Sequence, residues 1–226
     1  MKDFKKRAQD RLREEELELS RMRRLQEVLN KKFERGQKHF ILGAGTGGLA
    51  VVLTKEYGCD VCGIEPCKEQ FEIIREKCRQ AGINPKNFKQ EFGENMSFEA
   101  EEFDFIHCFT VLEHVQNIEK CIQEMLRIAK PGGVIYINTP NYSFPLERHY
   151  KIFFPTFLPK VFGYLYLFLR RKPLKFLKSI NFISESRLNK ILARQPGIYW
   201  LRIYKPCKLK FNSFIYPNQE IIIKKL

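Results

Sequence analysis

A glycine loop is the pattern with the clearest chemical meaning in this sequence. Residues 43 to 48 read Gly-Ala-Gly-Thr-Gly-Gly and lie between an apolar strand and an expected helix. Such a loop lets backbone N–H groups approach a ligand closely, at the positive end of the helix dipole. Glu65 ends the next expected strand, where a carboxylate can accept hydrogen bonds from two ribose hydroxyls. Together they predict a site for a nucleotide-like cofactor.

The loop alone does not identify that cofactor. Gly43, Gly45 and Gly48 also satisfy the dinucleotide pattern G-x-G-x-x-G, and an acidic residue near the position of Glu65 is expected of an NAD protein too. Motifs in the second half of the chain are therefore needed to distinguish a dinucleotide such as NAD from another nucleotide-like cofactor.

That half contains an ordered set of motifs. A strand beginning Phe103-Asp104 leads to Leu112-Glu113-His114-Val115, and Lys130-Pro131-Gly132-Gly133 precedes another apolar strand. In this order, residues 38–141 resemble class I S-adenosylmethionine (SAM)-dependent methyltransferases. Gln90-Glu91 and an apolar, basic insertion after the fifth strand are similar to the O-methyltransferases of ubiquinone biosynthesis.

The resemblance implies SAM as the cofactor and assigns the residues around it. The glycine loop would line the methionyl end, Glu65 the ribose and the stretch around Glu91 the adenine, with Phe109 beside the cofactor at the exit of the fourth strand. The full set of implied cofactor residues is Gly43, Ala44, Gly45, Gly47, Glu65, Glu91, Phe92 and Phe109.

The chain departs from the family pattern at two positions. The family usually places an acid two residues before the first loop glycine, where it helps hold the amino group of the cofactor, and this chain has Ile41 there. The ubiquinone enzymes resemble metal-binding proteins that use Glu, Glu and His in the fourth-strand segment. Here Glu113 and His114 match, but Thr110 replaces the first glutamate, so no metal is expected.

Strand and helix signals alternate from Lys38 onward. Strands are expected at 39–42, 60–64, near 88, at 103–109 and at 134–138, with helices at 48–56, 67–80, 118–129 and 185–193. This rhythm predicts an α/β fold with helices on both faces of a mostly parallel sheet. Two further strands, at 198–204 and 219–224, would complete seven strands with an antiparallel C-terminal hairpin. The expected architecture is a Rossmann-like class I methyltransferase sandwich.

Before this domain lies one long amphipathic helix. Leu12, Leu19, Met22, Leu29 and Phe33 recur at near-heptad spacing between charges of both signs. We expect it to pack against the domain or to form a dimer with a partner helix, because its acids interrupt any basic face. The predicted organisation is a helix at 1–36 and a SAM-binding domain at 37–226, with an insertion at about 142–180.

Composition limits the class of partner and the compartment. The 226 residues carry 40 Lys and Arg against 26 Asp and Glu, a net charge of +14, which favours an anionic partner such as nucleic acid or a membrane. Much of the excess charge lies beside apolar residues and no RNA-binding module is recognisable, so nucleic acid is the weaker choice. Seven cysteines and a charged N-terminus favour the reduced cytoplasm.

Three residues are candidates for catalysis. His149 lies just past the fifth strand, where parallel α/β sheets bind ligands, and would act as the base for a hydroxyl acceptor, with Tyr150 orienting that acceptor. His114 is the third candidate. The alternatives are that His149 caps or packs the insertion and that His114 is a helix-start residue held by backbone hydrogen bonds.

The insertion suggests the class of acceptor. Residues 152–169 are mostly apolar and aromatic, and Arg170, Arg171 and Lys172 follow. A membrane span here would separate the last strands from their sheet, so we expect a segment lying in the membrane interface or a lid over the site. The leading hypothesis is O-methylation of a hydrophobic or lipid-linked small molecule at a membrane surface. The alternatives are an RNA methyltransferase and a non-catalytic scaffold with the SAM fold.

Overall fold

The computed structural model describes residues 2–142, 146–147, 152–153, 160–171, 180–203 and 218–226. Its centre is a seven-stranded sheet in the order β3-β2-β1-β4-β5-β9-β8. The strands are β1 (Lys38–Leu42), β2 (Asp60–Ile64), β3 (Phe88–Lys89), β4 (Phe103–Phe109), β5 (Ala129–Pro140), β8 (Ile198–Ile203) and β9 (Asn218–Lys225). The first five run parallel, and β9 is antiparallel to both β5 and β8. The predicted mostly parallel sheet with an antiparallel C-terminal hairpin is therefore confirmed.

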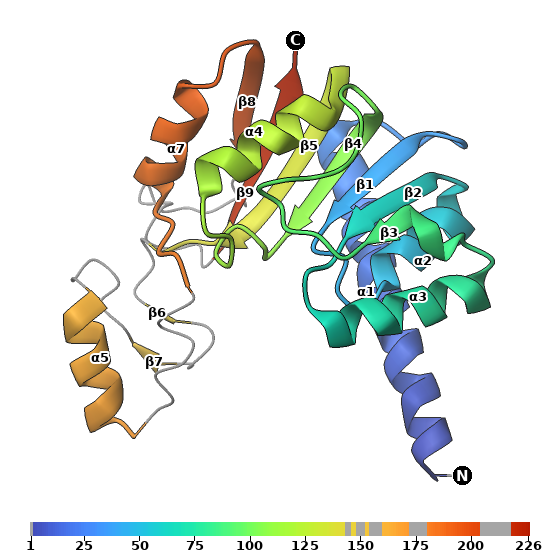
Figure 1. The fold of residues 1–226 in the computed structure, drawn as a ribbon, viewed down its shortest axis with the longest axis horizontal. Helices are drawn as coiled ribbons and strands as arrows, with labels where there is room; N and C mark the ends of the chain where they lie inside the picture. Colours follow the sequence, from blue (N-terminus) through green and yellow to red (C-terminus); the bar gives the residue numbers. More distant parts are fainter. Residues whose placement is uncertain (1, 143–145, 148–151, 154–159, 172–179, 204–217) are drawn as a thin grey trace.

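Helices cover both faces of the sheet (Figure 1). They are α1 (Lys2–Leu29), α2 (Gly48–Tyr57), α3 (Lys68–Ala81), α4 (Ile118–Ile128) and α7 (Glu185–Ala193), with the short helix η1 (Pro85–Asn87) before β3. Buried residues of α1, α2 and α3 share one apolar cluster, and those of α4 and α7 share the other. The hairpin of β6 (Leu146–Glu147) and β7 (Ile152–Phe153) and the helix α5 (Lys160–Leu169) lie in the predicted insertion.

Helix α1 packs on the domain through its C-terminal half. Met22 and Leu25 are buried there beside residues of β1 and α2. The helix ends at Leu29, earlier than the expected end near 35, because Asn30 takes a left-handed φ of +47°. The N–H of Phe33 then donates to the side-chain oxygen of Gln26 at 2.9 Å. Phe33 therefore leaves the line of the helix and packs against rings of the sheet.

Strand β5 is longer than the sequence predicts. We expected a Pro-Gly-Gly turn followed by a strand at 134–138, whereas β5 begins at Ala129. Ala129 pairs with Phe103 and Val134 pairs with Phe105, so the register shifts between these two points. The turn is thus accommodated as an irregularity inside the strand, with Gly132 at a φ of +76°.

Two histidines are buried in the centre of the sheet. His39 on β1 and His107 on β4 are both fully inaccessible, and His39 Nδ1 lies 2.9 Å from His107 Nε2. His39 Nε2 lies 3.1 Å from Oε1 of Gln37, an acceptor, which indicates that His39 donates there and accepts from His107. This tautomer places His107 Nδ1 as a buried acceptor with no hydrogen-bond partner in the described part of the chain.

Candidate cofactor and acceptor site

The glycine loop follows β1 at the carboxyl edge of the sheet. Gly43, Gly45 and Gly47 adopt φ values of +68°, +55° and +86°, which glycine reaches without steric cost. A Cβ at Gly43 would clash with Cγ2 of Val111, which follows β4. The loop therefore needs glycine at 43 both for its backbone conformation and for its close approach to the neighbouring strand end.

Replacing Gly43 by alanine should lower the free energy of unfolding by about 2–3 kcal/mol, because the new Cβ adds a steric clash to an unfavourable φ. Gly36→Ala is the matched control: its φ is +76°, but nothing lies within 4 Å of the added Cβ. That variant should lose only about 1 kcal/mol. Urea unfolding of the two variants checks the difference, and equal losses would contradict the packing argument.

Glu65 joins the glycine loop to the end of β2. Its Oε2 accepts from the N–H of Gly45 at 2.8 Å, and its Oε1 accepts from the N–H of Cys67 at 2.9 Å. The residue is 5% exposed, so its orientation is fixed by these two bonds. Each carboxylate oxygen keeps a further lone pair. The glycine loop and this acid can together fit an adenosyl cofactor, and the ribose role of Glu65 stays a prediction.

The predicted adenine residues lie after β3. Glu91 accepts hydrogen bonds from both the hydroxyl and the N–H of Ser97, so its carboxylate is already engaged. The ring of Phe92 is 63% exposed. An exposed aromatic ring at this end of the sheet is suited to contact a flat heterocycle, and its role there stays a prediction.

Phe109 ends β4 between the cofactor loop and the neighbouring strand. Its ring centroid lies 5.3 Å from that of Tyr136 on β5, and the guanidinium of Arg21 on α1 lies 5.6 Å from the same centroid. Helix α1 thus closes over the end of β4. Sequence reasoning treated this helix as an attachment and missed its contribution to the site.

Glu14 fastens α1 to the glycine loop. Its carboxylate accepts from the Thr46 hydroxyl and from the N–H of Gly48 at 3.2 Å, and it forms an ion pair of 2.7 Å with Lys77 on α3. Desolvation alone would raise the pKa of Glu14, but the bonds from Lys77 and Thr46 outweigh it and lower that pKa. No local signal distinguishes Glu14 among the many acids of α1, so only the structure shows this contact.

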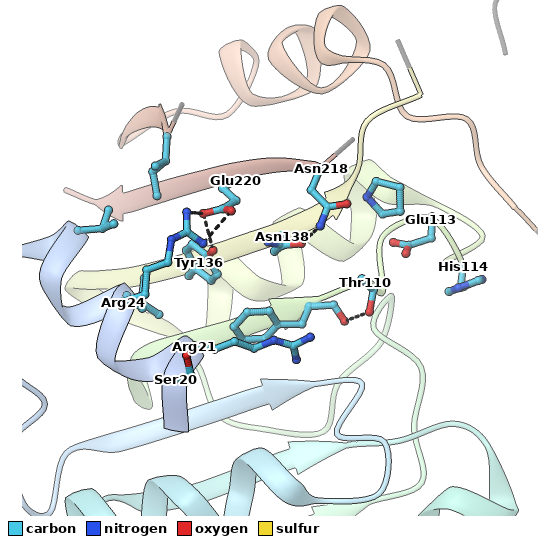
Figure 2. A pocket seen from close by; sticks show the side chains of 15 residues that line it. Ser20, Arg21, Arg24, Thr110, Glu113, His114, Tyr136, Asn138, Asn218 and Glu220 are labelled. Carbon is cyan, nitrogen blue, oxygen red and sulfur yellow. Dashed lines mark hydrogen bonds and ion pairs between the residues drawn. The ribbon is translucent and has the colours of Figure 1, made fainter. Parts of the chain in front are cut away.

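A cavity of about 530 Å³ opens between α1 and the ends of β4, β5 and β9 (Figure 2). Arg21 and Ser20 of α1 line it from one side, with Phe109 and Thr110 of the β4 end and Asn138 of β5 opposite. It neighbours the cofactor loop through the end of β4, because Phe109 lines the cavity and Val111, two residues further on, approaches Gly43. The cavity is therefore a candidate site for the methyl acceptor.

An ion pair crosses the wall of this cavity. Arg24 donates two hydrogen bonds to Glu220 of β9, at 3.0 and 2.7 Å, and the Tyr136 hydroxyl donates to Glu220 at 3.0 Å. Burial and the Glu220 carboxylate raise the pKa of Tyr136. Both arginines of the cavity are thus engaged, Arg24 by Glu220 and Arg21 by Glu18, at 2.7 Å.

Comparison with known proteins decides the family. A sequence profile described as "Methyltransferase domain" matches residues 11–195. The chain belongs to this methyltransferase family. The matched range includes most of α1 as well as the sheet up to α7, in agreement with the packing of that helix on the domain.

Two curated relatives illustrate the likeness. The "Ubiquinone biosynthesis O-methyltransferase" of Methylococcus capsulatus is 32% identical over 109 residues, which cover 48% of this chain and 45% of that protein. The "Norajmaline N-methyltransferase" of Rauvolfia serpentina is 33% identical over 97 residues, covering 42% and 33%. The matches thus span less than half of these relatives. They confirm the predicted likeness to the ubiquinone enzymes and support SAM as the cofactor. Because one of the two is named an N-methyltransferase, they do not distinguish O-methylation from N-methylation.

Solved structures share the fold at low identity. A putative sarcosine dimethylglycine methyltransferase from Galdieria sulphuraria gives a TM-score of 0.62 at 19% identity, covering 95% of this chain and 86% of that one. The [4+2]-cyclase SpnF gives 0.60 at 13% identity, covering 89% and 80%. The class I methyltransferase fold is therefore confirmed. The cyclase shows that the fold also occurs in a protein named for another reaction.

Of the three residues predicted to be catalytic in this methyltransferase domain, only His114 lies in the described part of the chain. His149 and Tyr150 lie outside the described residues. His114 is exposed, lines the cavity and donates its N–H to the carbonyl of Val111 at 2.8 Å. It lies in a turn four residues before α4, so the alternative that placed it at a helix start is wrong in its location.

Glu113 faces the interior. It is 1% exposed, and its Oε2 accepts from the Thr139 hydroxyl at 3.0 Å. Within the ranges that the structure describes, no group of three or more His, Cys, Asp and Glu side chains could hold a metal ion. Glu113 thus connects the end of β4 to β5, which supports the wall of the acceptor cavity.

Proposed function

We propose that this methyltransferase domain transfers a methyl group from SAM to a small molecule bound in the cavity beside Phe109. One observation carries the proposal: the glycine loop, Glu65 and the cavity lie at the same carboxyl edge of the sheet, where Phe109 lines the cavity and Val111 approaches Gly43. SAM, when bound, supplies a methyl group on a sulfonium that an in-line nucleophile can take. The residues around the cavity hold that nucleophile in position, which provides much of the rate.

A hydroxyl acceptor also needs a base. His114 is the candidate on the described wall of the cavity, and we retain His149, with Tyr150, as the base proposed from sequence. O-methylation is the finer part of the proposal. It is supported by the ubiquinone relatives, whereas the norajmaline relative is named for N-methylation.

We further propose that the acceptor is hydrophobic or lipid-linked and is met at a membrane surface. The support comes from α5, on which Phe162, Leu165, Phe168 and Leu169 are 52%, 57%, 70% and 71% exposed. Arg170 and Arg171 follow directly. Exposed aromatic and aliphatic side chains next to cations are typical of helices lying in the membrane interface. Among the described helices, none is long and apolar enough to cross a membrane.

Replacing Phe162, Leu165 and Phe168 together by serine should weaken binding to anionic vesicles at least tenfold, because these side chains would lose their burial in lipid. Ile73→Ser on α3 is the control, since Ile73 is also exposed, at 48%, but lies elsewhere. Flotation with vesicles of phosphatidylcholine and phosphatidylglycerol measures both. Unchanged flotation of the triple variant would remove the membrane part of the proposal.

The activity itself is tested with SAM labelled in its methyl group. The purified chain is incubated with vesicles that contain a prenylated catechol, and in a parallel reaction with total RNA. We expect label in the organic extract and none in the RNA. Label in RNA alone would favour the RNA methyltransferase, and label in neither, from a chain that binds SAM, would favour the scaffold hypothesis over this acceptor class.

A further inference from the structure

Glu18 on α1 carries a buried carboxylate that is only partly satisfied. Its Oε1 accepts from Arg21 at 2.7 Å, and its side chain is 13% exposed. The second oxygen, Oε2, is buried and has no hydrogen-bond partner among the residues that the structure describes. Leaving such an oxygen unpaired is costly, so the site favours a ligand that can donate to it.

The face of α1 that carries Glu18 also carries Glu14, which binds Thr46 and Gly48 at the end of the glycine loop. Glu14, Glu18 and Met22 follow one another at spacings of four, which places them on one side of the helix. Glu14 binds the loop, and Met22 is buried in the same apolar cluster as Ile41 of β1. Glu18 therefore lies between them, about one helical turn from each, at the carboxyl end of β1.

The ion pair with Arg21 relates Glu18 to the end of β4. The guanidinium of Arg21 that binds Glu18 also lies 5.6 Å from the ring centroid of Phe109, at the end of β4. Figure 2 shows Arg21 reaching from α1 over the end of that strand. Arg21 thus links the Glu18 carboxylate to the end of β4.

Its electrostatics agree with this position. Desolvation raises the pKa of Glu18, Arg21 opposes the increase, and the neighbouring Glu14 reinforces it. A cation next to Oε2 would favour the charged form and offset the desolvation. An ammonium group is suited to this position, because it would form a charge-assisted hydrogen bond with the unpartnered oxygen.

We propose that Glu18 binds the ammonium group at the methionyl end of SAM, in place of the acid that is absent at Ile41. The inference rests on the proposed function, since it assumes that SAM occupies the glycine loop. Glu18 comes from the N-terminal helix, so the helix supplies part of the cofactor site. The acid is thus provided from outside the strand that carries the loop.

Calorimetry with three ligands tests the assignment. S-adenosylhomocysteine has the amino and carboxyl groups, its decarboxylated form keeps only the amino group, and 5′-methylthioadenosine has neither. We expect Glu18→Gln to weaken binding of the first two by about 10- to 100-fold and to leave the third within about twofold of the wild type. Retained binding of methylthioadenosine also shows that the variant is folded.

Glu16→Gln is the matched control, because Glu16 is an exposed acid on the same helix. It should bind all three ligands as the wild type does. Wild-type affinity of Glu18→Gln for S-adenosylhomocysteine would overturn the assignment while leaving the proposed function intact. An equal loss of affinity for all three ligands would also overturn the assignment, because it would show that Glu18 shapes the site and does not bind the amino group. Failure of the wild type to bind any of them would instead overturn the proposed function, and this inference with it.

Discussion

Lowering the pH from 7 to 5 should reduce the free energy of unfolding by about 2 kcal/mol through His39 alone, with His107 adding to the loss. Burial lowers the pKa of His39 to about 3, an effect that Asp104 partly opposes. Burial also lowers the pKa of His107 well below its usual value, and His39 contributes in the same direction. Between pH 7 and pH 5, the two histidines therefore stay neutral in the folded protein, whereas in the unfolded chain they take up protons.

The direction follows from proton linkage. An unfolded histidine titrates near pH 6.5, so below that pH the unfolded state binds more protons than the folded state and stability falls. For His39 the loss accumulates from about pH 6.5 down to about pH 3, where the folded state begins to bind its own proton. The hydrogen bond between the two rings leaves neither a free solvated nitrogen to accept that proton.

Urea unfolding at pH 7 and pH 5 measures this effect. In a His39→Leu/His107→Phe variant, the free energy of unfolding should differ much less between pH 7 and pH 5, because both titrating rings are gone. The site should accept apolar side chains, since Phe33 and Phe105 already surround the pair with aromatic rings. His114→Gln should retain it, since His114 is exposed. If the double variant kept the full pH dependence, the buried pair would not be its source.

Glu65→Ala should weaken SAM binding at least about 100-fold. Two charge-assisted hydrogen bonds to the ribose would be lost, at about 1.5 kcal/mol or more each. The substitution also removes the acceptor that holds the N–H groups of Gly45 and Cys67, so the loop itself loses support. Calorimetric titration with SAM measures the loss.

A second acid at the same edge provides the control for Glu65. Glu91→Gln keeps the size of the side chain, and the wild-type carboxylate is engaged by Ser97. We expect that variant to lose less than tenfold in affinity. Equal losses in the two variants would contradict the ribose assignment of Glu65, and so would SAM binding to Glu65→Ala with wild-type affinity.

The parallel part of the fold was predictable because its signals are local. The strands at 60–64 and 103–109 and the helix at 185–193 were predicted with the bounds that the structure shows. The two strands are mostly apolar runs, and the helix is a periodic segment that begins after the capping Ser184. The long β5 was missed because Pro131 and Gly132 are typical of a turn, and only the pairing of Ala129 and Val134 with β4 on either side of them keeps them within a strand.

The cofactor loop was predictable for the same reason, since its glycines are adjacent in sequence. The contribution of α1 was not, because it depends on contacts between distant residues. Glu14 meets Gly48 and Lys77, and Arg24 meets Glu220, across separations that no periodicity reports. The near-heptad pattern did indicate the buried face of the helix at Met22, but it could not distinguish packing on the domain from a dimer.

This chain should bind an adenosyl sulfonium cofactor at the glycine loop. Calorimetric titration of the wild type with SAM, with S-adenosylhomocysteine and with NAD measures that binding. We predict micromolar binding of the first two and none of NAD, because we propose that the glycine loop and Glu65 hold the methionyl end and the ribose of SAM beside the acceptor cavity. Binding of NAD alone, or of none of the three to folded protein, would show that the glycine loop does not hold SAM.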